Sequence, residues 1–289
     1  MAMGTSDLFR LPLILFLKAI LSGLSSMLGK GFTEKRYTYQ CNGKGRTAIV
    51  WSESSLNNVE STVLRAEAPH FIAFGVSFKY FFFFFFLVCL QQCGMMLPLG
   101  SLLPHKIDRW LPDQIAFYHC GFHSTHNTLF DYKGRHYYDN CYIQGSVDFI
   151  FGHGRSVFHS CEIFVIGDKR VKIRGSVTAQ NRESENDYSG FSFVKGKVYS
   201  VCLGRAKGPH SRVFFAKTYL SKTIAPQGWI NWSYDGSTEN LFHAEYKCHG
   251  PGSESKERAA WSRELTEEEV APFLFIDCID GTHWLPVWL

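Results

Sequence analysis

Short runs of alternating hydrophobic and polar residues, separated by Gly, Asn and Asp, fill the middle of this 289-residue chain. This alternation is typical of β-strands, because successive side chains of a strand point to opposite faces. The charged helical pattern at residues 265–270 is short; Thr266 can cap it, and the glutamates that follow favour its N-terminus. The pattern therefore predicts an all-β chain with little helix.

A short repeat runs through the alternating region. Three six-residue segments share an aromatic residue, a cysteine three positions later and an apolar residue two positions after that: 117–122, 138–143 and 158–163. Their cysteines are spaced 21 and then 20 residues apart. A fixed period near 20 residues is the signature of a solenoid whose coils stack on their neighbours. With the strand pattern, it predicts a parallel β-helix with Cys120, Cys141 and Cys161 on successive rungs.

Composition limits the classes of function. The chain is 45% hydrophobic and 16% aromatic, which suits one large domain with an apolar interior. Its net charge of +4 is small and its basic residues are scattered, so nucleic acid is not an expected partner. The nine cysteines contain no CxxC pair, which favours interior thiols over a disulfide framework or a metal site.

Residues 145–152 hold the most informative side chain. They place Asp148 in an otherwise apolar run that glycine closes. Burying a carboxylate costs several kcal/mol of folding free energy unless the carboxylate is paired or hydrogen-bonded. Local sequence leaves two interpretations open: a satisfied structural acid, or a reactive group in a semi-apolar site.

Two further segments are unusual. Residues 1–28 contain an apolar run after Arg10, followed by small residues, and resemble a secretory signal. The Asn-Trp-Ser triplet at residues 231–233 is a glycosylation sequon that agrees with secretion. Residues 80–110 begin with Tyr80, which six phenylalanines follow. Their apolar stretch is too short to span a membrane, and the segment lacks the repeat. We interpret this segment as an anomaly such as translated intron.

Ordered motifs along the chain resemble one family. Residues 145–152 carry Asp-Phe-Ile-Phe-Gly and residues 203–205 carry Leu-Gly-Arg, and similar motifs continue in order at 134–138, 154–156, 211–214, 228–232, 245–246 and 250–252. Together they resemble the plant pectinesterases (pectin methylesterases), over residues 31–79 and 113–286. The resemblance implies a right-handed, single-stranded parallel β-helix over residues 31–289. It also implies a secreted, monomeric cell-wall hydrolase of galacturonan methyl esters in pectin, with no metal or other cofactor.

The resemblance assigns roles to individual residues. Asp148 matches the nucleophile, which attacks the ester carbonyl to form an acyl-enzyme. Arg205 matches the arginine that orients this carboxylate, and a bidentate pair would keep it ionised at mildly acidic pH. His126, Lys207 and Trp229 fall at substrate-binding positions.

The chain also departs from the family pattern. Asn127 stands where the family has the aspartic acid that protonates the leaving methanol, and an amide cannot transfer a proton. His126 replaces a glutamine that stabilises the oxyanion, and Lys207 replaces a tryptophan. These changes predict impaired esterase activity.

Two functions other than pectin ester hydrolysis are compatible with a β-helix scaffold. A non-catalytic pectin-binding protein would use the same scaffold, with Lys207 holding an anionic chain. A different β-helix enzyme is disfavoured, because a glycosidase needs paired carboxylates and a calcium-dependent lyase needs an acidic oxygen cluster, and neither accompanies Asp148.

Overall fold

The computed structural model describes residues 70–80, 113–125, 127–167, 175–231, 236–254 and 256–286, together with four short strands between residues 37 and 90. All described strands lie in one compact unit, Arg36–Leu289. The predicted signal segment 1–28 and most of segment 80–110 lie outside the described residues.

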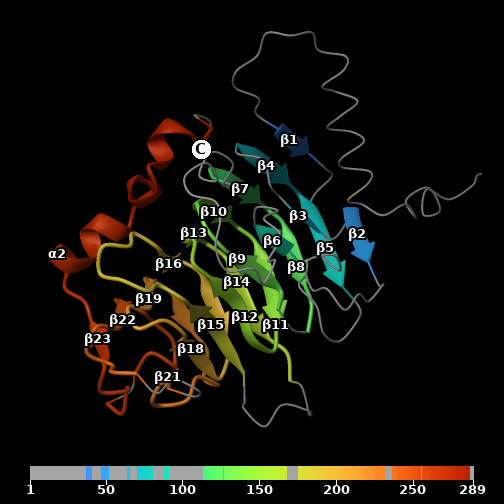
Figure 1. The fold of residues 1–289 in the computed structure, drawn as a ribbon. Coiled ribbons are helices and arrows are strands. Elements are labelled where there is room, and N and C mark those ends of the chain that lie inside the picture. Colours follow the sequence, from blue (N-terminus) through green and yellow to red (C-terminus); the bar gives the residue numbers. More distant parts are fainter. Residues whose placement is uncertain are drawn as a thin grey trace, which may run out of the picture. The chain divides into compact units, whose positions relative to one another are not determined.

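Three parallel sheets contain the described strands (Figure 1). Sheet A runs β1 (Tyr37–Gln40), β4 (Phe71–Phe74), β7 (Ile115–Tyr118), β10 (Arg135–Asp139), β13 (Arg155–His159), β16 (Gly190–Val194), β19 (Arg212–Ala216), β22 (Phe242–Tyr246), β23 (Ser262–Glu264). Sheet B runs β2 (Thr47–Trp51), β5 (Val76–Tyr80), β8 (Gly121–His123), β11 (Tyr142–Gly145), β14 (Glu162–Val165), β17 (Lys197–Tyr199), β20 (Tyr219–Leu220). Sheet C runs β3 (Leu64–Arg65), β6 (Val88–Leu90), β9 (Leu129–Asp131), β12 (Val147–Gly152), β15 (Ser176–Gln180), β18 (Cys202–Ala206), β21 (Trp229–Ile230).

The chain visits sheets A, B and C in turn and then returns to A one strand further along, so each circuit is one rung of a coil. Neighbouring strands pair in parallel, as in β10 with β13 and β11 with β14. The predicted parallel β-helix is confirmed. Val88–Leu90 pairs with β3 and β9, so this part of the anomalous segment continues the coil.

The interior of the coil is filled by side chains stacked from rung to rung. Ring centroids along one ladder are 4.5–5.4 Å apart, through Phe117, Tyr138, Phe158, Phe193 and Phe215. The predicted cysteine stack is confirmed beside this ladder. The thiol of Cys141 donates to the carbonyl oxygen of Phe117 on the preceding rung, and that of Cys161 donates to the carbonyl oxygen of Tyr138, each at 3.4 Å.

A segment of short helices covers the outside of sheet A (red in Figure 1). It contains α2 (Glu267–Val270) and the 3-10 helices η2 (Ala271–Phe273), η3 (Ile276–Ile279) and η4 (Gly281–His283). Thr266 caps α2, as the sequence predicts, through a reciprocal pair of hydrogen bonds with Glu269. Among the described residues, no helix is long and apolar enough to cross a membrane.

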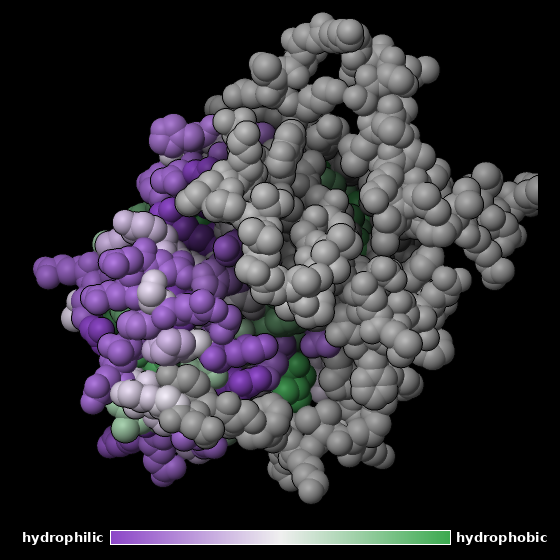
Figure 2. Space-filling view, viewed as in Figure 1, coloured by the Kyte–Doolittle hydropathy of each residue, from purple (hydrophilic) through white to green (hydrophobic). Residues whose placement is uncertain are grey.

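This C-terminal cover is held by two apolar clusters. One packs Ile279, Trp284 and Leu285 against outward side chains of β10 and β13. The other packs Leu265 and Val270 against β19 and β22. Figure 2 shows that the described surface on the visible face is mainly hydrophilic. Most buried apolar residues of the described part of the chain thus lie inside the coil or beneath the cover.

Candidate active site

A β-bulge interrupts sheet C at the acidic residue that the sequence singles out. Between the pairs Val147–Ser176 and Ile150–Thr178, strand β12 has two residues where β15 has one. The first of the two is Asp148, whose φ of 48° lies in the left-handed region. Such a backbone costs on the order of 1–3 kcal/mol for a non-glycine residue, and bulges redirect side chains. The chain therefore holds Asp148 in a strained, specific orientation.

The residues around Asp148 explain why the bulge forms here. Phe149, the second residue of the bulge, is fully buried in the coil. A Cβ atom added at Gly145 would overlap the Phe149 ring. Glycine at this position thus makes the room that lets Phe149 turn inward and leaves Asp148 at the outer edge.

Asp148 is joined to Arg205, which lies 57 positions later in the sequence. Nε of Arg205 donates to Oδ2 of Asp148 at 2.6 Å, and the two side chains are only 13% and 14% exposed. Arg205 lies on β18, two strands away from β12, and is in register with the small Ala179 of the intervening strand β15. The prediction that Asp148 and Arg205 lie within ion-pair reach is confirmed.

Burial raises the pKa of Asp148, whereas the Arg205 charge and hydrogen bond, the nearby Ser176 and the Lys207 charge act to lower it. The net shift is upward. Arg205 thus favours the ionised form of Asp148, as the sequence predicts, but desolvation of the carboxylate outweighs this effect. Oδ1 of Asp148 is buried and has no hydrogen-bond partner among the described residues.

Asn127 occupies the matching place on the preceding rung. Leu129 pairs with Ile150. Asn127 lies two residues before Leu129, just as Asp148 lies two residues before Ile150. Both residues have a φ of 48°. Asn127 is half-buried. The register therefore agrees with the prediction that Asn127 is close to Asp148, while His126 lies outside the described residues.

The two other predicted substrate contacts differ. Lys207 is exposed, and its charge reaches Asp148. Trp229 is 1% exposed and its ring stacks on His243 at 4.6 Å between centroids. It pairs in register with Gly204, whose position points into the coil. The prediction that Trp229 contacts substrate is wrong, because the residue belongs to the core.

Sequence reasoning missed an aromatic pair beside the site. Phe130 and Phe151 are half-exposed on the outside of sheet C, with stacked rings 4.9 Å apart. They share a register with Ala179 and Arg205. Strand alternation could have found them, since each follows an inward residue, Leu129 or Ile150. Within the described part of the chain, no group of three or more His, Cys, Asp or Glu could hold a metal ion.

Comparisons with known proteins agree with these features. The family model described as Pectinesterase matches residues 109–282. Probable pectinesterase 67 of Arabidopsis thaliana is 56% identical over 251 residues, which are 86% of this chain and 70% of that protein. Putative pectinesterase 14 of the same plant is 39% identical over 249 residues, covering 84% of this chain and 71% of that protein.

Two solved structures share the fold. The pectin methylesterase from carrot superposes with a TM-score of 0.73 at 21% identity, covering 90% of this chain and 88% of that one. The deglycosylated pectin methylesterase from Aspergillus niger gives a TM-score of 0.69 at 20% identity, covering 99% and 96%. The sequence matches, with this shared fold, show that the chain belongs to the pectinesterase family.

Proposed function

We propose that this chain is a carboxylic ester hydrolase of pectin, acting on the methyl esters of galacturonan, with Asp148 as its nucleophile. The observation that carries the proposal is the Asp148–Arg205 pair at 2.6 Å on a bulged strand, with the second carboxylate oxygen unpartnered among the described residues. Its support from outside the chain is that the relatives bear the name pectinesterase.

Oδ1 of Asp148 would attack the ester carbonyl carbon, and the carbonyl oxygen would take the negative charge. Collapse of this intermediate breaks the bond to the methoxy oxygen and leaves a mixed anhydride with Asp148. The departing methoxide needs a proton to leave as methanol. Water then attacks the anhydride, releases the galacturonate carboxylate and restores Asp148. Arg205 holds Oδ2, which fixes the direction of Oδ1.

The step that this chain is least equipped for is protonation of the departing methoxide. The Asn127 amide can donate a hydrogen bond but cannot give up a proton to methoxide or remove one from water. A positioned general acid contributes about 10²- to 10⁴-fold to such a step. We therefore propose that the activity of the chain is low. His126 precedes this residue and would be the candidate for stabilising the oxyanion.

Replacing Asn127 by Asp tests the proposal. An aspartic acid added beside Asp148 would be kept protonated by its like-charged neighbour and by partial burial, which is the state a general acid requires. Methanol release from methylated pectin by N127D is expected to exceed that of the wild type by about 10²- to 10⁴-fold. A folded N127D with no gain, or a wild type already as fast as an intact enzyme of this class, would contradict the assignment of Asn127.

A second function, pectin binding without catalysis, is favoured by Asn127 together with the exposed, basic Lys207. Here the aromatic pair Phe130–Phe151 and Lys207 would hold a polyanionic chain. Binding of demethylated polygalacturonate to the wild type, weakened in K207Q, would support this function. Wild-type methanol release that is lost in D148N would favour the enzyme.

The same proposals place the protein in the cell wall as a secreted monomer. The N-terminal pattern of residues 1–28 and the identity of the relatives support secretion. A C-terminal fluorescent fusion that remains inside plasmolysed cells would contradict it.

A further inference from the structure

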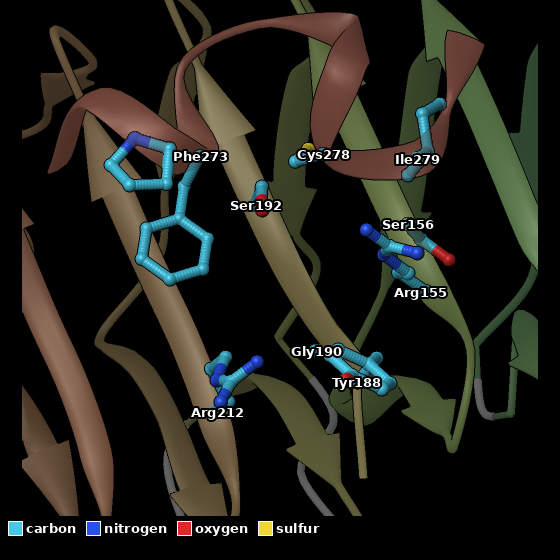
Figure 3. Close-up of a pocket in the computed structure, with 10 residues that line it drawn as sticks. Arg155, Ser156, Tyr188, Gly190, Ser192, Arg212, Phe273, Cys278 and Ile279 are labelled. Carbon is cyan, nitrogen blue, oxygen red and sulfur yellow. The ribbon is translucent and has the colours of Figure 1, made fainter. Parts of the chain in front are cut away.

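A second site lies on the outside of sheet A, away from Asp148 on sheet C. Between the two apolar clusters of the C-terminal cover is a cavity of about 150 Å³ (Figure 3). Its walls include Arg155, Gly190, Ser192 and Arg212 from the sheet, and Phe273 and Ile279 from the cover. The cavity exists because β16 presents only the small Gly190 and Ser192 here.

The cavity interrupts a ladder of arginines. Arg135 pairs in register with Arg155, and Arg155 pairs with Gly190. Arg212 comes next on β19, since the following residues Phe191 and Val213 pair. A Cβ atom at Gly190 would lie 2.9 Å from Cδ of Arg212, so glycine makes room for this side chain. Like charges on neighbouring strands repel one another.

The nearby acidic residues pair with two of the three arginines and leave the third unpaired among the described residues. Arg135 is bound by Asp113 and, at 3.0 Å, by Asp280. Arg155 shares Asp280 at 3.6 Å. Arg212, by contrast, has no carboxylate within ion-pair distance in the described part of the chain, and its Nε is buried without an acceptor.

The other groups around Arg212 do not supply a negatively charged partner for its guanidinium group. Its guanidinium carbon lies 5.7 Å from the centre of the Phe273 ring, a favourable but apolar contact. The negative charge that acts on Arg212 is that of Asp187, whose carboxylate is already bound by His153 and the Ser189 N–H. Burial, with the charges of Arg182 and Arg155, lowers the pKa of Arg212 to about 10. A half-buried cation surrounded in this way is stabilised by an added anion.

We propose that this cavity binds a small oxyanion, a phosphate, sulfate or carboxylate group, between the guanidinium groups of Arg155 and Arg212. Figure 3 shows both guanidinium groups and the Ser192 hydroxyl around the same opening, with Tyr188 at its rim. A guanidinium fork matches the geometry of an oxyanion, and its charge-assisted hydrogen bonds are among the strongest that proteins form. The bound anion would bridge β13 and β19 beneath the cover. The site does not depend on the proposed esterase chemistry.

Thermal unfolding of the full chain tests the site. Protein free of phosphate and sulfate is titrated with inorganic phosphate or, separately, with galacturonate, while sodium chloride holds the ionic strength constant. At ten times the dissociation constant, the wild-type Tm is expected to rise by roughly 3–5 °C. R212Q is expected to lose this rise. R263Q is the matched control, because Arg263 is an exposed arginine already paired with Glu269 outside the cavity.

The outcomes separate clearly. A rise with phosphate alone supports a site for a free inorganic anion, and a rise with galacturonate supports a site for a sugar carboxylate. No rise with either probe, or an equal rise in R212Q, would overturn the proposal. Should R212Q fail to fold, S192L keeps both arginines and fills the cavity. The Tm of S192L is expected to stay unchanged when either anion is added. A rise in S192L equal to that of the wild type would also count against the site.

Discussion

The outside of sheet A and the outside of sheet C are built on the same coil and differ in regularity. On sheet A, strands β10, β13, β16, β19 and β22 pair residue for residue, and apolar side chains lie beneath the C-terminal cover. On sheet C, β12 carries an extra residue, and Asp148 stands there in a left-handed backbone conformation.

The comparison teaches where a coiled repeat can hold reactive chemistry. A covered face needs strands in continuous register, because any shift would separate its apolar contacts from the cover. A face without that constraint can accept a bulge, whose strain is offset by the interior packing of Phe149 and by the ion pair with Arg205. Charged side chains on the covered face need ion-pair partners. Arg212 has none among the described residues, and the cavity lies beside it.

Breaking the cover should have the largest effect on stability. Trp284 is buried against sheet A, and its Nε1 donates to the carbonyl oxygen of Ile279 at 2.9 Å. Trp284→Ala is expected to lower the free energy of unfolding by about 3–5 kcal/mol, measured by chemical denaturation. Phe275→Ala is the control, since Phe275 is 64% exposed and should change stability by less than about 0.5 kcal/mol. Equal losses in both variants would mean that the cover is not docked as described.

Breaking the bulge should cost less stability. In Gly145→Ala, the added methyl group meets the Phe149 ring, so the ring or the bulge must shift. We expect a loss of about 1–3 kcal/mol. Gly167→Ala is a matched control because an added Cβ there meets nothing within 4 Å. A Gly145→Ala variant as stable as this control would show that the space under Phe149 does not shape the bulge.

The smallest effect concerns the protonation of Asp148. Carbon-13 NMR of its carboxyl group, assigned with D148N, should titrate above the ordinary range of aspartate because burial raises the pKa. K207Q should move the midpoint slightly further up, since the Lys207 charge favours the carboxylate. As the folded-state pKa is raised, this group stabilises the fold at low pH, and that contribution is lost as pH rises through the folded pKa. A midpoint at or below the ordinary value would contradict the dominance of burial.

Much of this structure follows from local sequence. The spacing of Cys120, Cys141 and Cys161 predicts their stacking because interior positions repeat once per rung. The Thr266 cap is likewise local. The bulge at Asp148 is not, since it depends on how β12 pairs with β15. The family resemblance places Trp229 at a substrate-binding position, and its two-residue strand has too little alternation to show that the side chain faces inward.

The Arg212 cavity could not be predicted from sequence for a related reason. Its walls come from β13, β16, β19 and the C-terminal cover, and no single motif contains them. Arg212 looks like an ordinary surface arginine in the sequence. Its environment appears only when the cover is placed over Gly190 and Ser192.

The most direct test of the account asks whether ester hydrolysis belongs to sheet C alone. Methanol release from methylated pectin is measured for N127D, N127D/D148N and N127D/R212Q, all shown to be folded. Asn tolerates the left-handed backbone at position 148, so D148N removes the nucleophile with little change of shape. D148N is expected to abolish the gain from N127D, whereas R212Q is expected to retain it. Retained activity in N127D/D148N, or an equal loss in N127D/R212Q, would contradict the central claim.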